Sequence, residues 1–109
     1  MDNIKNDKYY IDKALENINA IIGYTQGMDK ETFVSEEMLL DAVMFRLVQM
    51  TENINRISGE YKEKHPEIPW GLIAGFRNGI VHDYGKTDYT IVYEIISSDI
   101  YNLKDMLER

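Results

Sequence analysis

Apolar residues recur along this chain every three or four positions, the spacing that gathers them on one face of an α-helix. The first such stripe predicts a helix from Asp7 to Gln26, with Asn6 or Asp7 as its N-cap and Gly27 at its end. Its apolar positions are Ile11, Leu15, Ile18 and Ile22. No segment alternates apolar and polar residues with the period of two that marks a half-buried strand. The pattern therefore predicts an all-helical chain.

The longest stripe predicts a second helix, which Ser35 caps and which ends at His65-Pro66, because proline disfavours helix at the residue before it. Its apolar positions are Leu39, Val43, Leu47, Met50, Ile54, Ile57 and Tyr61. Gly59 lies inside this helix and is predicted to kink or fray its last turns. The segment 28–34 before it is predicted to be a connector or a single short turn.

A short third helix is predicted from about Trp70 to His82, directly after Pro69. Its buried stripe consists of Ile73, Phe76 and Ile80. Three glycines spaced four apart form a smooth face suited to the close approach of another backbone: Gly71, Gly75 and Gly79.

A fourth helix is predicted to follow a Thr87 or Asp88 cap and to run to the C-terminus. Its apolar positions are Val92, Ile96, Ile100, Leu103 and Leu107. Four striped helices joined by short connections predict an up-and-down antiparallel four-helix bundle with a short third helix. At 109 residues the chain is expected to form one domain, residues 1–109.

Composition narrows the class of protein. The chain has no cysteine, which excludes disulfides and thiolate metal sites. Its first residues lack the apolar stretch of a signal peptide, and no apolar run has the length of a membrane span. We therefore expect a soluble, cytoplasmic protein that does not associate with membranes.

The net charge of −7 argues against a broad nucleic-acid-binding surface. The charge is unevenly distributed, because the segment from Arg56 to Lys86 carries five basic and four acidic residues. It is the least acidic part of the chain. An RNA phosphate can approach there, and a dimer would double that surface.

The most concentrated chemistry lies in the segment Gly71 to Tyr84, which contains the pattern R-N-x3-H-x-Y. On a helix, Asn78 and His82 are an i,i+4 pair and Arg77 lies about 100° round from Asn78. Such a set suits metal-independent cleavage of an RNA phosphodiester. His82 suits acid or base work, Arg77 suits stabilising charge on the phosphate oxygens, and Asn78 suits positioning the phosphate or the imidazole.

Each of these residues also has an ordinary structural explanation. Arg77 fits a surface ion pair, His82 a satisfied histidine at a helix end, and Tyr84 an aromatic at the rim of the bundle. If the set is catalytic, one copy supplies only one histidine, so a separate acid and base require a dimeric site. A metal site is disfavoured, because His65 and His82 lack carboxylate partners at ligand spacing. No cofactor is expected.

The stretch IPWGLIAGFRNGIVHDYG, from Ile68 to Gly85, resembles the signature of HEPN-domain proteins, and most closely that of the HepT-like toxin subfamily. The mark of that subfamily is R-x4-H-x-Y with a polar residue after the arginine. Its positions are filled by Arg77, Asn78, His82 and Tyr84. The segment LVQMTENINRIS resembles the family's helix with an acidic residue, here Glu52. The resemblance covers essentially the whole chain.

This resemblance implies a helical bundle that dimerises so that two R-x4-H motifs face one another in a metal-independent endoribonuclease site. It implies the toxin of a toxin–antitoxin pair, whose partner is a minimal nucleotidyltransferase, with a homodimer or a larger hetero-oligomer as the assembly. The partner would transfer AMP to Tyr84, adding negative charge and bulk that repel RNA. Glu52 would have a supporting role. The alternative is a non-catalytic HEPN scaffold that binds and regulates a nucleotidyltransferase.

Overall fold

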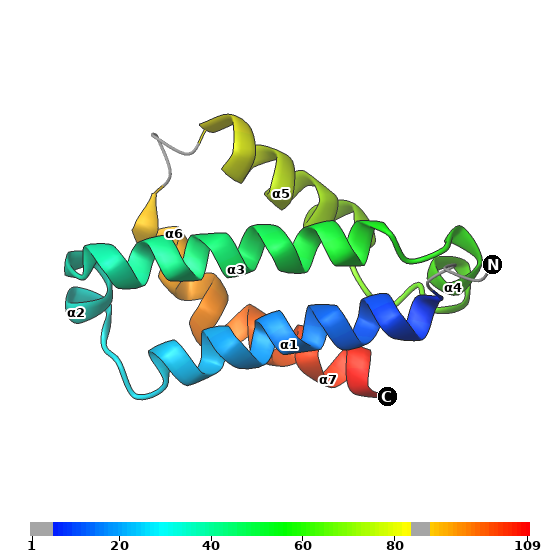
Figure 1. Ribbon diagram of the computed structural model, residues 1–109, viewed down its shortest axis with the longest axis horizontal. Coiled ribbons are helices and arrows are strands. Elements are labelled where there is room, and N and C mark those ends of the chain that lie inside the picture. Colours follow the sequence, from blue (N-terminus) through cyan, green and yellow to red (C-terminus); the bar gives the residue numbers. More distant parts are fainter. Residues whose placement is uncertain (1–5, 84–87) are drawn as a thin grey trace.

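The computed structural model describes the backbone of residues 6–83 and 88–109, and the side chains of residues 6–76 and 88–109. Within these ranges every regular element is a helix, which confirms the predicted all-α class (Figure 1). The long helices α1 (Asp7–Thr25) and α3 (Glu37–Asn55) run antiparallel and pack together. The C-terminal helical segment packs against α1, and α5 (Trp70–Asp83) packs against α3. These four long segments alternate in direction, as a four-helix bundle requires (Figure 1).

Helix α1 begins and ends where the sequence predicts. The side chain of Asn6 accepts a hydrogen bond from the backbone N–H of Tyr9, which confirms Asn6 as the N-cap. The helix ends at Thr25, and Gly27 follows with a φ of 78°, a conformation that glycine adopts without strain. The residues buried on its inner face are Ala14, Asn17, Ile18, Ile21 and Thr25.

The predicted connector before the second long helix is the six-residue helix α2 (Lys30–Ser35). Asp29 caps it through the N–H of Thr32, and Phe33 anchors it because its side chain is fully buried. The prediction that Ser35 caps α3 is wrong. Ser35 closes α2 instead, donating its hydroxyl to the Thr32 carbonyl, and α3 starts without a side-chain cap.

The prediction of a single long second helix is also wrong. The helix is interrupted at residues 56–58, which separate α3 from the short α4 (Gly59–Lys64). Ser58 caps α4 by accepting a hydrogen bond from the Tyr61 N–H. The hydroxyl and N–H of Ser58 both donate to the Asp7 carboxylate at the start of α1. Gly59 is therefore the first residue of a new helix and not a kink inside an old one.

The C-terminal segment contains a wider turn that the stripe did not reveal. Asp88 caps α6 (Tyr89–Glu94), as predicted, whereas Thr87 lies outside the described residues. The π-helical segment η2 (Ile95–Asp99) then leads into α7 (Ile100–Glu108). All five predicted apolar positions are buried: Val92, Ile96, Ile100, Leu103 and Leu107.

One hydrophobic core joins these helices. It contains Val43, Leu47 and Ile54 from α3 together with the inner faces of α1, α2 and the C-terminal segment. Ile73 and Phe76 of α5 pack against its edge, as predicted, and are only partly buried. The described helices include none that is both long enough and apolar enough to cross a bilayer.

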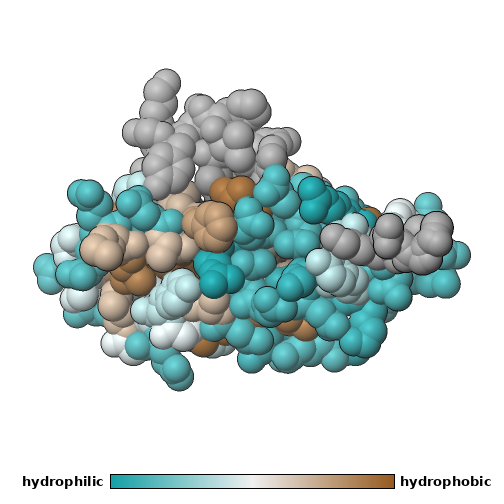
Figure 2. Space-filling model, viewed as in Figure 1, coloured by the Kyte–Doolittle hydropathy of each residue, from teal (hydrophilic) through white to brown (hydrophobic). Residues whose placement is uncertain are grey.

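On the face seen in Figure 2, hydrophilic residues cover most of the surface. Hydrophobic residues gather towards the left, where α2 and the first half of α3 lie (Figures 1 and 2). The exposed apolar residues of α3 are Met38 and Phe45, and we refer to these two as the α3 patch.

Candidate functional site

The backbone of α5 carries three of the four motif residues in its second half. Arg77, Asn78 and His82 are helical, so the predicted i,i+4 relation between Asn78 and His82 is confirmed for the backbone. Their side chains lie outside the described residues, as does the whole of Tyr84. Their predicted catalytic and modification roles therefore stay predictions.

The position of α5 is set at its first residue. The Trp70 indole N–H donates to the backbone carbonyls of His65 and Lys62, with N···O distances of 3.0 and 3.2 Å. The Lys62 carbonyl also accepts the backbone N–H of His65, and the His65 carbonyl accepts that of Ile68. The indole adds a side-chain contact between the end of α4 and the first residue of the helix that bears the motif.

Aromatic and charged side chains surround this corner. The Tyr61 and His65 rings are stacked with centroids 4.1 Å apart, and the Tyr61 ring meets the Trp70 ring edge-on at 6.2 Å. The Lys62 ammonium lies 5.7 Å from the centroid of the Trp70 ring. The pKa of the Tyr61 phenol is raised, first by burial and then by the negative charges of Glu67 and Asp7. The apolar stripes do not predict this ring stack.

His65 belongs to this corner and not to the motif. Its Nδ1 lies 3.4 Å from a carboxylate oxygen of Glu67. It precedes α5, whereas Arg77 and His82 lie in the second half of that helix. Among the described side chains, no group of three or more His, Asp or Glu residues is arranged to hold a metal ion.

Glu52, the predicted supporting residue, lies on α3, the helix against which α5 packs. Its side chain is partly buried and makes a polar or electrostatic contact. Its place on the helix that packs against α5 is compatible with support of the motif, and that role stays a prediction.

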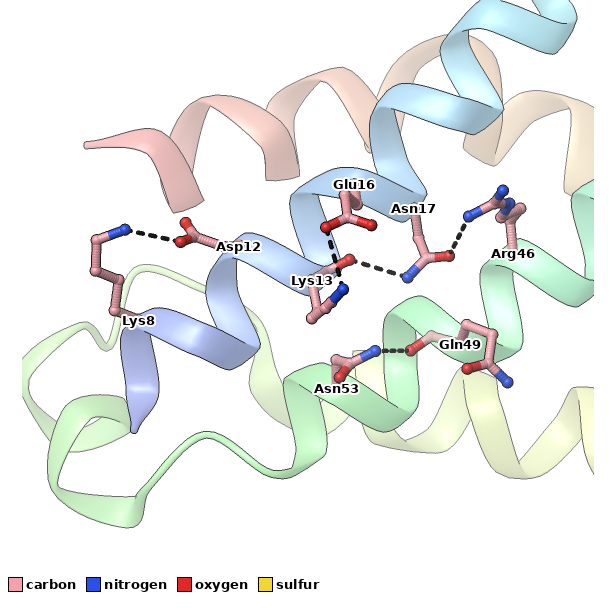
Figure 3. A network of polar contacts seen from close by, with 8 residues as sticks. All are labelled: Lys8, Asp12, Lys13, Glu16, Asn17, Arg46, Gln49 and Asn53. Atoms are coloured by element: carbon pink, nitrogen blue, oxygen red, sulfur yellow. Dashed lines mark hydrogen bonds and ion pairs between the residues drawn. The ribbon is translucent and has the colours of Figure 1, made fainter. Parts of the chain in front are cut away.

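A polar network joins α1 to α3 (Figure 3). The Arg46 guanidinium donates to the Asn17 side-chain oxygen at 3.2 Å and to the Tyr24 hydroxyl at 3.4 Å. Asn17 in turn donates to the Lys13 carbonyl. Because the side chain of Arg46 is occupied in holding two helices together, we assign it a structural role.

A hollow among the described residues runs beside the first half of α5. It has a volume of about 460 Å³ and lies between α3, α5 and the η2–α7 segment. Among the lining residues that the structure describes, Asp99 is the one titratable residue. This mostly apolar lining suits contact with apolar groups better than acid–base chemistry.

Comparison with known proteins finds a matching family and several similar proteins. The profile of the ribonuclease HepT-like family matches residues 14–109 of the chain. A candidate RNase of Methanocaldococcus jannaschii is 30% identical over 101 residues, which span 93% of each protein. A protein of Thermococcus cleftensis with the name "Probable ribonuclease HepT" is 29% identical over 105 residues, 96% of each protein. No solved structure matches the chain significantly.

Proposed function

The chain belongs to the ribonuclease HepT-like family and is thereby an endoribonuclease, and we propose that it cuts RNA without a metal ion, in a site that two copies share. The observation that carries this proposal is the complete R-N-x3-H-x-Y pattern in the sequence, within the family match, with Arg77, Asn78 and His82 on α5. RNA chains supply the nucleophile, the ribose 2′-hydroxyl, so the protein needs only to move protons and stabilise charge.

In the proposed reaction His82 of one copy takes the proton of the 2′-hydroxyl, whose oxygen then attacks the adjacent phosphorus. The bond from phosphorus to the 5′-oxygen breaks, and His82 of the second copy gives a proton to that leaving oxygen. Arg77 stabilises the charge on the non-bridging phosphate oxygens, and Asn78 holds the phosphate or the imidazole. The products are a 2′,3′-cyclic phosphate and a free 5′-hydroxyl.

The second part of the proposal concerns regulation. We assign the chain as the toxin of a cytoplasmic toxin–antitoxin pair, with a minimal nucleotidyltransferase as its partner. The Tyr84 phenol oxygen would attack the α-phosphorus of ATP, pyrophosphate would leave, and AMP would remain on the tyrosine. The added negative charge would repel the RNA phosphate next to the motif. The mass of the protein after incubation with that enzyme and ATP tests this step. One AMP is expected on the native chain and on Tyr101→Phe, and none on Tyr84→Phe.

The cleavage proposal is tested with the two histidines of the chain as a matched pair. His82→Ala is expected to lower the rate of tRNA or mRNA cleavage by a factor of about 10² to 10⁴, the usual contribution of an acid–base group. His65→Ala removes the other histidine, at the α4–α5 corner, and is expected to keep most of the activity. The unmodified protein should be purified free of its partner, and cleavage followed on labelled RNA. Equal rates for His82→Ala and the native chain would refute the proposed chemistry.

The acidic net charge of −7 favours one rival, a non-catalytic scaffold that binds and regulates a nucleotidyltransferase. In that case Arg77→Ala and His82→Ala would leave the effect of the protein on cell growth unchanged. A growth-arrest assay with both variants separates the two functions. We expect both variants to relieve arrest, because the proposed toxin acts by cutting RNA.

A further inference from the structure

A second hollow lies at the end of α1, next to the π-helical segment η2. It has a volume of about 220 Å³, and one side is lined by residues Thr25 to Met28, where α1 ends. The other side is lined by residues of α6, η2 and α7: Tyr93, Ile96, Ser97 and Tyr101. It shares no lining residue with the hollow beside α5, and in Figure 1 the end of α1 and α5 lie on opposite sides of α3. The chemistry proposed for the motif therefore does not account for this second hollow.

The hydroxyl groups of its lining donate their hydrogens within the chain. The Thr25 hydroxyl donates to the Ile21 carbonyl at 2.8 Å, and the Tyr93 hydroxyl donates to the Met28 carbonyl at 2.9 Å. The Ser97 hydroxyl donates to the Tyr93 carbonyl at 2.6 Å. A hydroxyl has one hydrogen to donate and two lone pairs that accept, so each of these oxygens can still accept a hydrogen bond from a ligand. The lining is therefore richer in acceptors than in donors.

The π-turn of η2 lies where this hollow forms. Ile95 and Asp99 of η2 line the hollow beside α5, whereas Ile96 and Ser97 line the second hollow. Single π-turns inside helices occur frequently at functional sites. The wider turn therefore marks the second hollow as a candidate site, in addition to the acceptors in its lining.

The end of α1 gives this hollow a negative electrostatic potential. The carbonyl end of a helix carries a partial negative charge, which a basic residue in the last turn commonly offsets. Residues 22–25, the last turn of α1, include no lysine, arginine or histidine. Arg46 contacts the Tyr24 hydroxyl in that turn but is not part of the lining. The hollow therefore favours a cation over an anion, as does the net charge of −7.

The volume and the rest of the lining favour an organic cation. The volume of about 220 Å³ equals that of roughly seven water molecules at about 30 Å³ each, which is more than a single metal ion occupies. Met28 and the buried Ile96 offer apolar contacts to a short alkyl chain. Tyr93 and Tyr101 add aromatic rings, which attract cations. A primary ammonium group donates three hydrogen bonds and accepts none, so it matches a lining rich in acceptors.

We propose that the second hollow binds the primary ammonium group of an alkylamine, held by the hydroxyl oxygens of Thr25 and Ser97 and by the carbonyl end of α1. The alkyl chain lies against Met28 and Ile96. Two sources supply this chemistry, a free alkylamine and the lysine side chain of another protein, which ends in the same butylammonium group. The proposal does not depend on RNA cleavage, because none of these residues belongs to the motif.

The first test compares three ligands with the same four-carbon chain: butylammonium, 1-butanol and butyrate. Each is added to the isotope-labelled native chain at constant ionic strength, and binding is followed by NMR. Butylammonium is expected to bind with a dissociation constant of about 1–10 mM, in line with the limits on affinity for so small a ligand, and to shift the amide signals of Gly27 and Ser97. 1-Butanol, which lacks the charge, is expected to bind about tenfold more weakly, and butyrate to give no shift there. Equal affinity for butylammonium and 1-butanol, or shifts by butylammonium at other residues alone, would overturn the proposal.

The second test uses neighbouring serines as a matched pair. Ser97 lines the hollow, whereas Ser98 is the next residue of η2 and is not part of the lining. Ser97→Ala is expected to weaken butylammonium binding about fivefold, the usual effect of losing one hydrogen bond. Ser98→Ala is expected to leave the affinity unchanged. Both side chains are exposed, so both variants should keep the native circular dichroism. Native affinity in Ser97→Ala, or an equal loss in both variants, would contradict the proposed site.

A third measurement separates the two sources of the ammonium group. Nα-acetyl-lysine methylamide carries the lysine side chain on a peptide-like backbone, whereas butylammonium has no such group. If both bind the native chain with similar affinity, the hollow admits a lysine of another protein. If the peptide-like backbone weakens binding at least tenfold, the hollow admits a free alkylamine alone. In either case Ser97→Ala must weaken the binding, and a ligand whose affinity it leaves unchanged does not bind at the proposed site.

Discussion

Hydrogen bonds at one end of the molecule fix the segment that leads into α5. The Asp7 carboxylate accepts hydrogen bonds from the N–H and the hydroxyl of Ser58, at 2.8 and 2.7 Å. The Ser58 hydroxyl oxygen also accepts the N–H of Tyr61, the residue whose ring lies against Trp70. A contact between residues 51 positions apart therefore joins the start of α1 to the corner from which α5 departs.

The first prediction concerns this contact. The two hydrogen bonds from Ser58 hold the pKa of Asp7 below its usual value. The ionised Asp7 carboxylate therefore stabilises the fold above the ordinary aspartate pKa of about 3.9. This stabilisation is lost as the pH falls through the lower pKa that Asp7 has in the folded chain. Asp7→Ala removes the acceptor of both hydrogen bonds and should reduce the free energy of unfolding at pH 7 by about 1 kcal/mol. The loss is no larger because water screens a carboxylate this near the surface. In urea unfolding, the difference in stability from the native chain should shrink as the pH falls below the ordinary aspartate pKa of about 3.9.

Asp12→Ala serves as the control for this prediction. Asp12 lies on the same helix. In the described part of the chain, its carboxylate forms an ion pair with the exposed Lys8. Such surface pairs contribute about 0.5 kcal/mol or less. A gap for Asp7→Ala that is equally large at pH 7 and pH 3 would contradict the assigned cause.

At the scale of elements, the apolar stripes predicted which residues are buried better than where helices end. The C-terminal stripe steps twice by four residues, from Val92 to Ile96 to Ile100. An ordinary helix would turn such positions gradually away from the core, and the π-turn of η2 compensates by adding a residue. The same double step of four, from Leu39 to Val43 to Leu47, lies in the regular helix α3, so periodicity did not predict the π-turn.

The apolar pattern failed to predict the break at Ser58 for a different reason. Ile57 and Tyr61 continue the spacing of the preceding stripe, although they belong to the connection and to α4. What ends α3 is a long-range partner, Asp7, and periodicity carries no information on such a contact. For the candidate site, the sequence predicted the helix that carries the motif, and the roles of Arg77, Asn78 and His82 rest on the pattern of residues.

Two glycines with equally open surroundings give the second prediction, on the helix α5 itself. Gly75 lies inside the helix and Gly27 follows α1 at a φ of 78°, and neither would bring a new Cβ within 4 Å of another atom. Gly75→Ala should raise the free energy of unfolding by about 0.5–1 kcal/mol, because alanine loses less backbone freedom in a helix. Gly27→Ala should lower it by about 1–2 kcal/mol, because a side chain is strained at positive φ.

Both glycine variants should be measured by chemical unfolding over a range of protein concentrations, so that association between copies does not mask the effect on one copy. A loss of stability for Gly75→Ala at the lowest concentrations would show that α5 packs more closely within one copy than the structure indicates.

At the scale of the whole molecule, charge limits where RNA can bind. The chain measures 45 × 28 × 27 Å and carries a net charge of −7, so most of its surface repels a phosphate backbone. The least acidic segment includes α5, and a dimer along this helix would place two copies of Arg77 near one seam. RNA binding should therefore depend on few charges, unlike that of proteins with a broad basic surface.

The third prediction follows from this small number of charges at the RNA-binding surface. Two arginines that neutralise two phosphates of single-stranded RNA give a slope of about −1.4 for the logarithm of the association constant against the logarithm of salt concentration. Raising salt from about 50 to about 250 mM should thus weaken binding about tenfold. The His82→Ala chain is the right material, because it should bind RNA without cutting it, and fluorescence anisotropy gives the constant. Adding Arg77→Gln should reduce the slope nearly to zero. A slope of about −3 or steeper in both chains would instead place RNA on other lysines and arginines and away from the motif.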